Sequence, residues 1–409
     1  MRIAFFTPEF PPLTVGGLGV YSAEISYAFS REGHYVDVFT LGSITQDPLD
    51  ELSPNFLVHR FKTTLDPHSV CEIGNAFCYN IGMANLFFNE IDKGKCYDVV
   101  AINDWLSSVA GLIIKEKCKL PIFFHLHSNE PVRMYGGGSE IIKTLEWLMV
   151  EACNRIIVKC YAMQDAVWGE GYPTSKISLV YSGCDPLKYD PVMVNESLID
   201  ELRAMYGVEP GDKVVLFIGR ITWIKGVEPL LVAFRKIVES EKNVKLIILG
   251  VPGDAYDGAI ETATRLNLQD YVRFRFELVP EQEKIAHYGM SDLCVFPSLA
   301  ESSGLACLEA MSMAKPVVVG ATGVSVLREF VVPAGPEQNG VHVNPKDPDD
   351  LARGIKWVLS NPSREKIGRK GRDRVVSYFS WKNSALKTLD LYKDSIKGLT
   401  RKLAAESDF

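Results

Sequence analysis

The sequence lacks the features that mark membrane-spanning, secreted and nucleic-acid-binding proteins. No apolar run reaches the roughly 18 residues needed to cross a bilayer, and the opening MRIAFFTPEFPP is a short strand broken by prolines rather than the apolar core of a signal peptide. The 44 basic and 51 acidic side chains give a net charge of −7, without any block of like charges. We therefore expect a cytoplasmic protein with no nucleic-acid partner and no membrane span, while a peripheral membrane contact stays open.

Cysteine pairs and metal-ligand spacings are also missing. The 9 cysteines are scattered, with no CxxC pair, and an odd number cannot all pair within one chain. Free thiols in a reducing compartment and no metal site are the expectation. The chain has no serine hydrolase elbow, Walker loop or HExxH motif, so those chemistries have no support in the sequence.

The 409 residues exceed the size at which single cores stop growing, and short apolar strands alternate with helical patterns. Continuous apolar strands predict parallel sheets covered on both faces, hence two doubly wound, Rossmann-like α/β domains facing a cleft. We place them at residues 1–185 and 186–380, with a helix at 381–409 that packs back towards the first domain. The expected strands are 2–7, 35–40, 56–61, 98–102, 121–126, 155–160, 176–181, 213–219, 244–250, 272–277, 292–297 and 315–320.

In such sheets ligands bind beyond the carboxyl ends of the strands, so the segments that follow strands are the ones to inspect. After strand 2–7, Gly16, Gly17 and Gly19 let the backbone approach a ligand at the start of a helix that ends at Gly33. This is not a GxGxxG motif, and a turn without a ligand is the alternative.

After strand 213–219, Arg220 and Lys225 lie in the turn before a helix. Two cations beside a helix N-terminus form a cradle for a diphosphate. Solvated surface charges are the alternative.

The third segment is ESSGLACLEAM, which follows strand 292–297 and sets Glu301 and Glu309 eight positions apart. We expect a serine to cap the helix here, and a fully helical path between the two glutamates would cover about 12 Å. Glu309 then meets the ribose of a nucleotide-sugar, Glu301 meets its sugar, and backbone N–H groups near Gly304 meet phosphate. A solvated helix residue and a loop charge are the alternative.

The fourth segment carries His125 and His127 at the end of strand 121–126. Strand alternation sends both to one side, so at most one is expected to reach the rim of the cleft. A single histidine is more often structural than functional.

Taken in order, these motifs resemble a GT-B glycosyltransferase of family 4 (group 1), related to the family 5 glycogen and starch synthases. The similar stretches cover nearly the whole chain: GGLGVYSAEISYAFSREGHYVDVFT, GRITWIKGVEPLL, PSLAESSGLACLEAMSMAKPVVV, NGVHVNPKDPDDLA and FSWKNSA. The resemblance implies a retaining, metal-independent transferase that uses a nucleoside diphosphate sugar and no further cofactor.

The resemblance also implies roles for individual residues. Arg220 and Lys225 hold the diphosphate, Glu309 the ribose and Glu301 the hydroxyls of the donor sugar. His127 contacts the sugar near the reacting carbon, whereas His125 is left out. The remaining donor-binding positions are backbone contacts at Gly16, Gly17, Ser303, Gly304 and Leu305.

Four departures from the family pattern stand out. Val15 replaces the lysine of family 5, and Ser303 replaces an aromatic residue of the glutamate motif. The second glycine-rich turn appears only as ATGVSVLRE, and SGCD stands at the domain join.

The stretch HLHSNEPVRMYGGGSE resembles glycogen-synthase-like members of family 4. It favours glucose from a UDP- or ADP-linked donor and an α-glucan acceptor. The alternatives are a family 4 enzyme acting on a cell-envelope glycan, glycolipid or small glycoside, a nucleotide-sugar epimerase, and a non-catalytic binding protein with the same fold.

Overall fold

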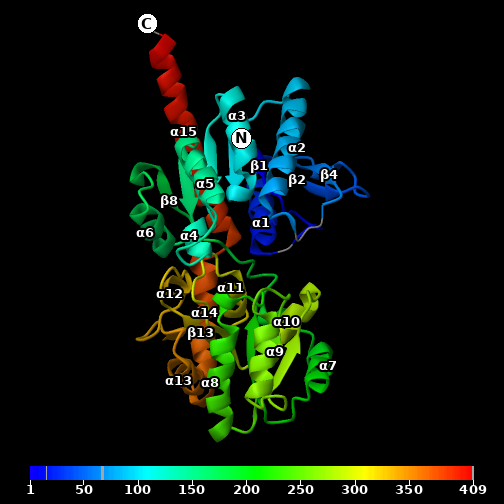
Figure 1. Cartoon of the computed structure of the whole chain (residues 1–409), viewed down its shortest axis with the longest axis vertical. Helices are drawn as coiled ribbons and strands as arrows, with labels where there is room; N and C mark the ends of the chain where they lie inside the picture. The colour runs from blue at the N-terminus through cyan, green and yellow to red at the C-terminus, as the bar shows by residue number, and fades with distance from the viewer. Residues whose placement is uncertain (15, 66–68, 408–409) are drawn as a thin grey trace. The chain divides into compact units, whose positions relative to one another are not determined.

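The computed structural model describes residues 1–14, 16–65 and 69–407, which form two compact α/β units (Figure 1). Unit 1 comprises Met1–Ser182 together with Trp381–Phe409, and unit 2 comprises Gly183–Ser380. Each unit is built on its own, mainly parallel sheet. The prediction of two Rossmann-like α/β domains is therefore confirmed.

Unit 1 has a sheet in the order β3-β4-β2-β1-β5-β6-β7-β8. Every residue of the interior strands β5 and β6 is buried, as expected for a sheet covered on both faces. The strands are β1 (Arg2–Phe6), β2 (Tyr35–Ser43), β3 (Leu49–Ser53), β4 (Phe56–Thr63), β5 (Val99–Asn103), β6 (Ile122–His125), β7 (Arg155–Val158) and β8 (Ile177–Leu179).

The helices of unit 1 include one from the far end of the chain. Helix α15 (Trp381–Ser407), red in Figure 1, packs against the blue α1 of the same unit. Helix α1 ends where Gly33 adopts a left-handed φ of 81°, which lets the Gly33 N–H donate to Ser30 O. The other helices are α1 (Gly17–Arg31), α2 (Ile73–Asp92), α3 (Ser108–Lys117), α4 (Glu130–Arg133), α5 (Glu140–Ala152) and α6 (Tyr161–Gly169).

Unit 2 has a parallel sheet in the order β11-β10-β9-β12-β13-β14. The strands are β9 (Lys213–Ile218), β10 (Val244–Leu249), β11 (Val272–Arg275), β12 (Leu293–Phe296), β13 (Val317–Gly320) and β14 (Gly340–Val343). The helices are α7 (Glu196–Tyr206), α8 (Val227–Ser240), α9 (Tyr256–Arg265), α10 (Glu281–Met290), α11 (Leu305–Ser312), α12 (Leu327–Phe330), α13 (Pro348–Ser360) and α14 (Arg364–Tyr378).

The order of the strands fixes where each sheet can hold a ligand. The connections reverse direction between β1 and β5 in unit 1 and between β9 and β12 in unit 2. A crevice opens at such a switch point, beyond the carboxyl ends of the two strands. The segments after β1, β9 and β12 are the ones that carry the predicted glycine, basic and acidic motifs.

Two strands were not predicted from the sequence. Strand β3 is an edge strand, antiparallel to β4, and its residues LDELS are exposed or half-buried. Because none of its residues is buried, the strand needs no alternation of apolar and polar side chains, and the sequence shows no pattern that would predict it. Strand β14 has only four residues, and its pairing with β13 comes from the tertiary structure.

Among the described helices, none has the combined length and apolar character that a membrane crossing requires.

Candidate active site

The basic turn of unit 2 follows β9. Lys225 ends a short turn of 3-10 helix, and Gly226 starts α8 with a left-handed φ of 71°. A Cβ atom at position 226 would lie 2.1 Å from the carbonyl oxygen of Pro297, so only glycine fits there. Arg220 is exposed earlier in the same turn.

The acidic motif lies beside this turn. Lys225 Nζ forms an ion pair with Glu301 Oε2. The backbone joins the two segments as well, because the Leu299 N–H donates to Ile224 O at 2.8 Å. The structure thus brings together Lys225 and Glu301, which are 76 positions apart in the sequence, at the switch point of the sheet.

The carboxylate of Glu301 is held from several sides. Its Oε1 accepts hydrogen bonds from the N–H groups of Ser303 (3.3 Å) and Gly304 (3.1 Å). Burial raises the pKa of Glu301, but the ion pair with Lys225 and these two N–H groups outweigh it, so the pKa lies below its ordinary value. Glu301 is therefore an anion with a fixed orientation.

The start of the helix differs from the prediction. Helix α11 begins at Leu305, its cap is Gly304 with φ 62°, and no side chain caps it, so the expected serine cap is wrong. Residues 301–304 are not helical, so Glu301 lies in the turn before the helix and Glu309 lies within it. The N–H groups of Ser303 and Gly304, expected to face phosphate, donate to Glu301 in this structure.

The main chain of Glu301 pairs with the segment ATGVSVLRE. The Glu301 N–H donates to Val324 O at 2.8 Å, and the Val326 N–H donates to Glu301 O at 2.7 Å. This segment, noted as an altered glycine-rich turn, therefore fixes the position of Glu301.

Glu309 lies on α11 and is buried, with 8% of its surface exposed. Its Oε1 accepts from the Tyr189 hydroxyl (2.9 Å) and from Lys284 Nζ (3.2 Å), and its Oε2 accepts from the Tyr288 hydroxyl (2.9 Å). Sequence reasoning missed these three partners. Lys284 and Tyr288 stand four positions apart on α10, a spacing that puts both on one face of a helix and was available as a signal.

In unit 1, the predicted glycine turn lies at the start of α1. Gly16 is the N-cap of the helix, and its N–H donates to Glu9 Oε2 at 3.0 Å. Gly17 is the first residue of the helix. Val15, noted as a departure from family 5, lies outside the described residues.

The two histidines occupy different environments in unit 1. His125 is fully buried, with its ring nitrogens 2.8 Å from the Tyr21 hydroxyl and 2.7 Å from the Tyr392 hydroxyl. His127 lies past the end of β6, with Nε2 3.4 Å from Asn103 Oδ1, and its ring packs against that of Tyr21 at 4.4 Å. Burial lowers the pKa of both rings well below the ordinary range, so both are neutral.

A charged cluster that includes Glu130 and Arg133, a few positions after His127 in the sequence, was also missed. Asp104 follows β5 with a left-handed φ of 55°, and Arg133 Nη1 lies 3.2 Å from its Oδ1. Arg133 Nη2 also pairs with Glu130 (3.0 Å) and Glu146 (2.7 Å). The position of Asp104 directly after a strand was a usable signal, because the same rule located the other motifs.

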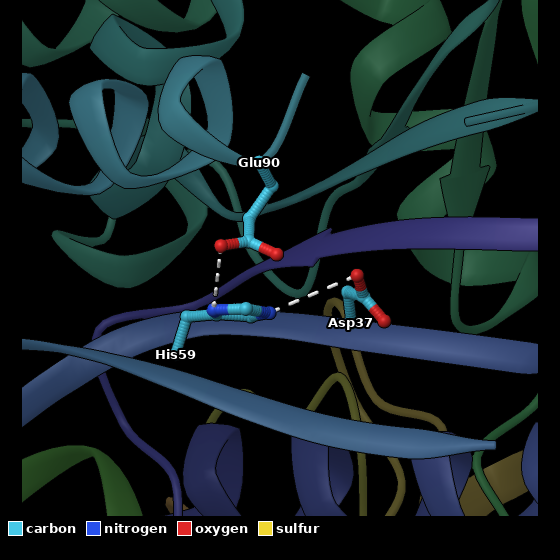
Figure 2. A group of neighbouring side chains, drawn as sticks. All are labelled: Asp37, His59 and Glu90. Atoms are coloured by element: carbon cyan, nitrogen blue, oxygen red, sulfur yellow. Dashed lines mark ion pairs between the residues drawn. The ribbon is translucent and has the colours of Figure 1, made fainter. Parts of the chain in front are cut away.

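A second cluster contains metal-ligating residue types but lies elsewhere. Figure 2 shows His59 between Glu90 and Asp37, with its two ring nitrogens 4.0 and 3.7 Å from their carboxylate oxygens. Lys95 Nζ lies 2.7 Å from Glu90 and 2.8 Å from Asp37, so an ammonium group already bridges the two carboxylates. Asp37 lies near the start of β2, whereas the predicted site residues follow strand ends. We interpret the cluster as an ion-pair network of the sheet.

Comparison with known proteins agrees with this arrangement. Residues 15–187 match the family model Glycosyltransferase Family 4, and residues 199–374 match Glycosyl transferases group 1. A glycosyltransferase of Methanocaldococcus jannaschii is 32% identical over 98% of this chain and 100% of its own length. A glycogen synthase of Mycobacterium tuberculosis is 25% identical over 97% of this chain and 96% of its own length.

Solved structures share the fold. Sucrose-phosphate synthase from Thermosynechococcus elongatus superposes with a TM-score of 0.82 at 24% identity, covering 97% of this chain and 99% of that one. The catalytic domain of starch synthase IV from Arabidopsis thaliana gives 0.77 at 16% identity, covering 97% and 99%. The chain therefore belongs to the GT-B glycosyltransferases, with a family 4 region in unit 1 and a group 1 region in unit 2.

Proposed function

We propose that this glycosyltransferase is a retaining enzyme that moves glucose from a UDP- or ADP-linked donor to an α-glucan. The observation that carries the proposal is the Lys225–Glu301 pair at the switch point of unit 2, with Arg220 in the same turn. It combines fixed positive charge for a diphosphate with a fixed carboxylate for sugar hydroxyls, at the place where this sheet type binds ligands.

Fixed cations can take the place of a metal ion here. The bond between the sugar and the diphosphate breaks with negative charge developing on the departing phosphate, and Arg220 and Lys225 stabilise that charge. The acceptor oxygen bonds to the same carbon from the same face, and its proton passes to a phosphate oxygen of the leaving group. This front-face route needs no protein nucleophile.

Glu309 binds the ribose in this proposal, although its carboxylate already accepts three hydrogen bonds. The Tyr189 hydroxyl lies between the carboxylates of Glu309 and Glu281. Since it carries one proton, it serves one of these two carboxylates at a time. A ribose hydroxyl can therefore take over at Glu309 while Tyr189 keeps its bond to Glu281.

We also propose roles for residues of unit 1. We propose His127 as the neutral side chain beside the reacting carbon of the sugar, and the backbone at Gly16 and Gly17 as a contact for donor phosphate. The charged cluster of Asp104, Glu130, Arg133 and Glu146 adjoins His127 along the chain and offers hydroxyl-binding groups for an acceptor.

A different acceptor is the second candidate. The relatives include a D-inositol 3-phosphate glycosyltransferase, 27% identical, and an alpha-maltose-1-phosphate synthase, 28% identical. Their names point to small phosphorylated acceptors or products, in line with the small-glycoside alternative. The HSNE stretch favours the glucan.

The test measures nucleoside diphosphate release from UDP-, ADP- and GDP-sugars, each with and without glycogen. Glycogen-stimulated release from a glucose donor is the expected result, with the anomeric configuration of the new bond read by NMR. Turnover that ignores glycogen would move the acceptor to small molecules or lipids. No turnover of any nucleotide-sugar would overturn the proposal.

A further inference from the structure

Four buried polar side chains form a continuous chain in unit 1, and only one of them was singled out by the sequence. Lys159 Nζ lies 2.7 Å from the Tyr21 hydroxyl, which lies 2.8 Å from His125 Nδ1, and His125 Nε2 lies 2.7 Å from the Tyr392 hydroxyl. None of the four is more than 1% exposed. They come from α1, the end of β6, the residue after β7, and α15.

The three hydrogen bonds of this series can form with all four side chains uncharged. The Lys159 amine donates to the Tyr21 oxygen, the Tyr21 hydroxyl donates to His125 Nδ1, and His125 Nε2–H donates to Tyr392. Burial lowers the pKa of Lys159 and His125 well below their ordinary ranges, because an ion without solvent is costly. The Lys159 amine supplies a hydrogen-bond donor to the Tyr21 hydroxyl.

Tyr21 connects this chain to His127. Its hydroxyl is held by Lys159 and His125, while its ring meets the His127 ring edge-to-face, with centroids 4.4 Å apart and planes at 78°. Rotation or displacement of the Tyr21 ring would therefore change its packing contact with the His127 ring. Aromatic pairs of this geometry hold their rings in a preferred orientation.

We propose that Lys159 is a positioning residue: by holding the Tyr21 hydroxyl, its amine fixes the ring that orients His127 towards the transferred sugar. The inference rests on the proposed function, because it takes His127 as the group beside the reacting carbon. Lys159 itself touches no substrate, since none of its surface is exposed.

Two substitutions remove the link from either side. Lys159→Met keeps the length of the side chain without the donor, and Tyr21→Phe keeps the ring without the hydroxyl. Each is expected to lower kcat for sugar transfer about tenfold or more, because small misplacements of a reacting group have large effects on rate. The donor KM should change less than about twofold, because the diphosphate and ribose contacts are intact. The kcat of the double variant should match that of Tyr21→Phe, because that substitution already removes the hydroxyl that Lys159 holds.

Tyr79→Phe is the matched control. Tyr79 is also fully buried in unit 1, but its hydroxyl donates to the carbonyl of Val70 at 3.1 Å. Tyr79→Phe removes this one buried hydrogen bond and leaves the bonds among Lys159, Tyr21, His125 and Tyr392 in place. The kcat of this variant should therefore equal that of the wild type.

The second readout is the ring ¹⁵N NMR spectrum of His127, assigned with a His127→Gln variant. Lys159→Met and Tyr21→Phe should both shift or broaden the His127 signals, and Tyr79→Phe should not. Wild-type kcat and unchanged His127 signals in Lys159→Met would overturn the inference, whatever the change in thermal stability. If the wild type turns over no nucleotide-sugar, the proposed function fails instead, and the His127 signals still decide whether Lys159 positions the ring.

Discussion

At the scale of single residues, the candidate site uses charge that is fixed in place before any substrate arrives. Lys225 is paired with Glu301, and Glu301 is also held by two backbone N–H groups. Groups that are already oriented need no reorganisation during the reaction, which makes them effective in stabilising a transition state. Loss of either member should therefore affect rate more than folding.

Replacing Lys225 with Ala or Glu301 with Gln should lower kcat by about 100-fold or more, because each removes a fixed electrostatic contact to the donor. The melting temperature should fall much less than the activity, because solvent still reaches both side chains, with 26% and 16% of their surface exposed, and screens their attraction. Product formation and a melting curve measure the two effects.

Lys236→Ala is the control for this experiment. Lys236 lies on α8 and pairs with Asp349 at 2.5 Å, with both side chains exposed. It should keep full activity. Wild-type kcat in the Lys225 and Glu301 variants would contradict the site assignment.

At the scale of elements, short turns at strand ends set the geometry of both units. Helices α8 and α11 are each capped by a glycine with a left-handed φ, Gly226 and Gly304. Lys225 and Glu301 lie just before these glycines. In unit 1, the Asp37, His59 and Glu90 network of Figure 2 links strands β2 and β4 with helix α2. Each arrangement gives a test of stability.

Gly226→Ala should destabilise unit 2 by more than about 2 kcal/mol, because a positive φ and a clash with Pro297 O act together. Gly207→Ala separates the two causes. Gly207 has φ 61°, but the nearest atom to a Cβ there is Arg273 Nη2 at 3.7 Å, an ordinary contact. Its cost should be about 1 kcal/mol, from the backbone conformation alone. Urea unfolding compares the two, and equal losses would rule out the clash.

Asp37→Asn should make stability less dependent on pH in acid. Burial raises the pKa of Asp37, but the adjacent His59 ring and the hydrogen bonds from Lys95 and Tyr97 outweigh it and lower the pKa from 3.8 to about 2. A lowered carboxyl pKa stabilises the fold above pH 3.8, and this contribution, about 2 kcal/mol, is lost as pH falls towards 2. Urea unfolding midpoints between pH 2 and 5 should fall more steeply in the wild type than in the variant. Parallel curves would show that Asp37 carries no such contribution.

At the scale of the whole molecule, the chain leaves unit 1 after Ser182, builds unit 2, and returns to unit 1 at Trp381. Helix α15 then completes the core of unit 1, where Ala385, Leu389 and Tyr392 are almost wholly buried. Folding of unit 1 thus requires both ends of the sequence, whereas unit 2 is continuous.

Leu389→Ala should therefore destabilise unit 1 and leave unit 2 unchanged. Removing a fully buried leucine side chain costs about 3 kcal/mol. Leu386 on the same helix is 37% exposed, and Leu386→Ala should cost less than about 1 kcal/mol. Hydrogen exchange followed by mass spectrometry reports on peptides of the two units separately. Equal loss of protection in β5 and in β9 would contradict the assignment of α15 to unit 1.

The sequence by itself determined the fold class and the position of most strands, because buried parallel strands are continuous apolar runs that need no partner to be recognised. It also placed Lys225 and Glu301 after strands. It did not reveal β3, whose residues have no buried face, and it assigned a serine cap where the helix starts at Gly304.

Only the tertiary structure decided which distant residues meet. The Lys225–Glu301 pair, the three partners of Glu309, and the Lys159–Tyr21–His125–Tyr392 chain join segments far apart in the sequence. The spacing of apolar residues indicates which side of a helix or strand is buried, but it does not indicate which residues of other elements pack against that side. A buried lysine such as Lys159 therefore carries no local signal, and its role follows only from the hydroxyl that it holds.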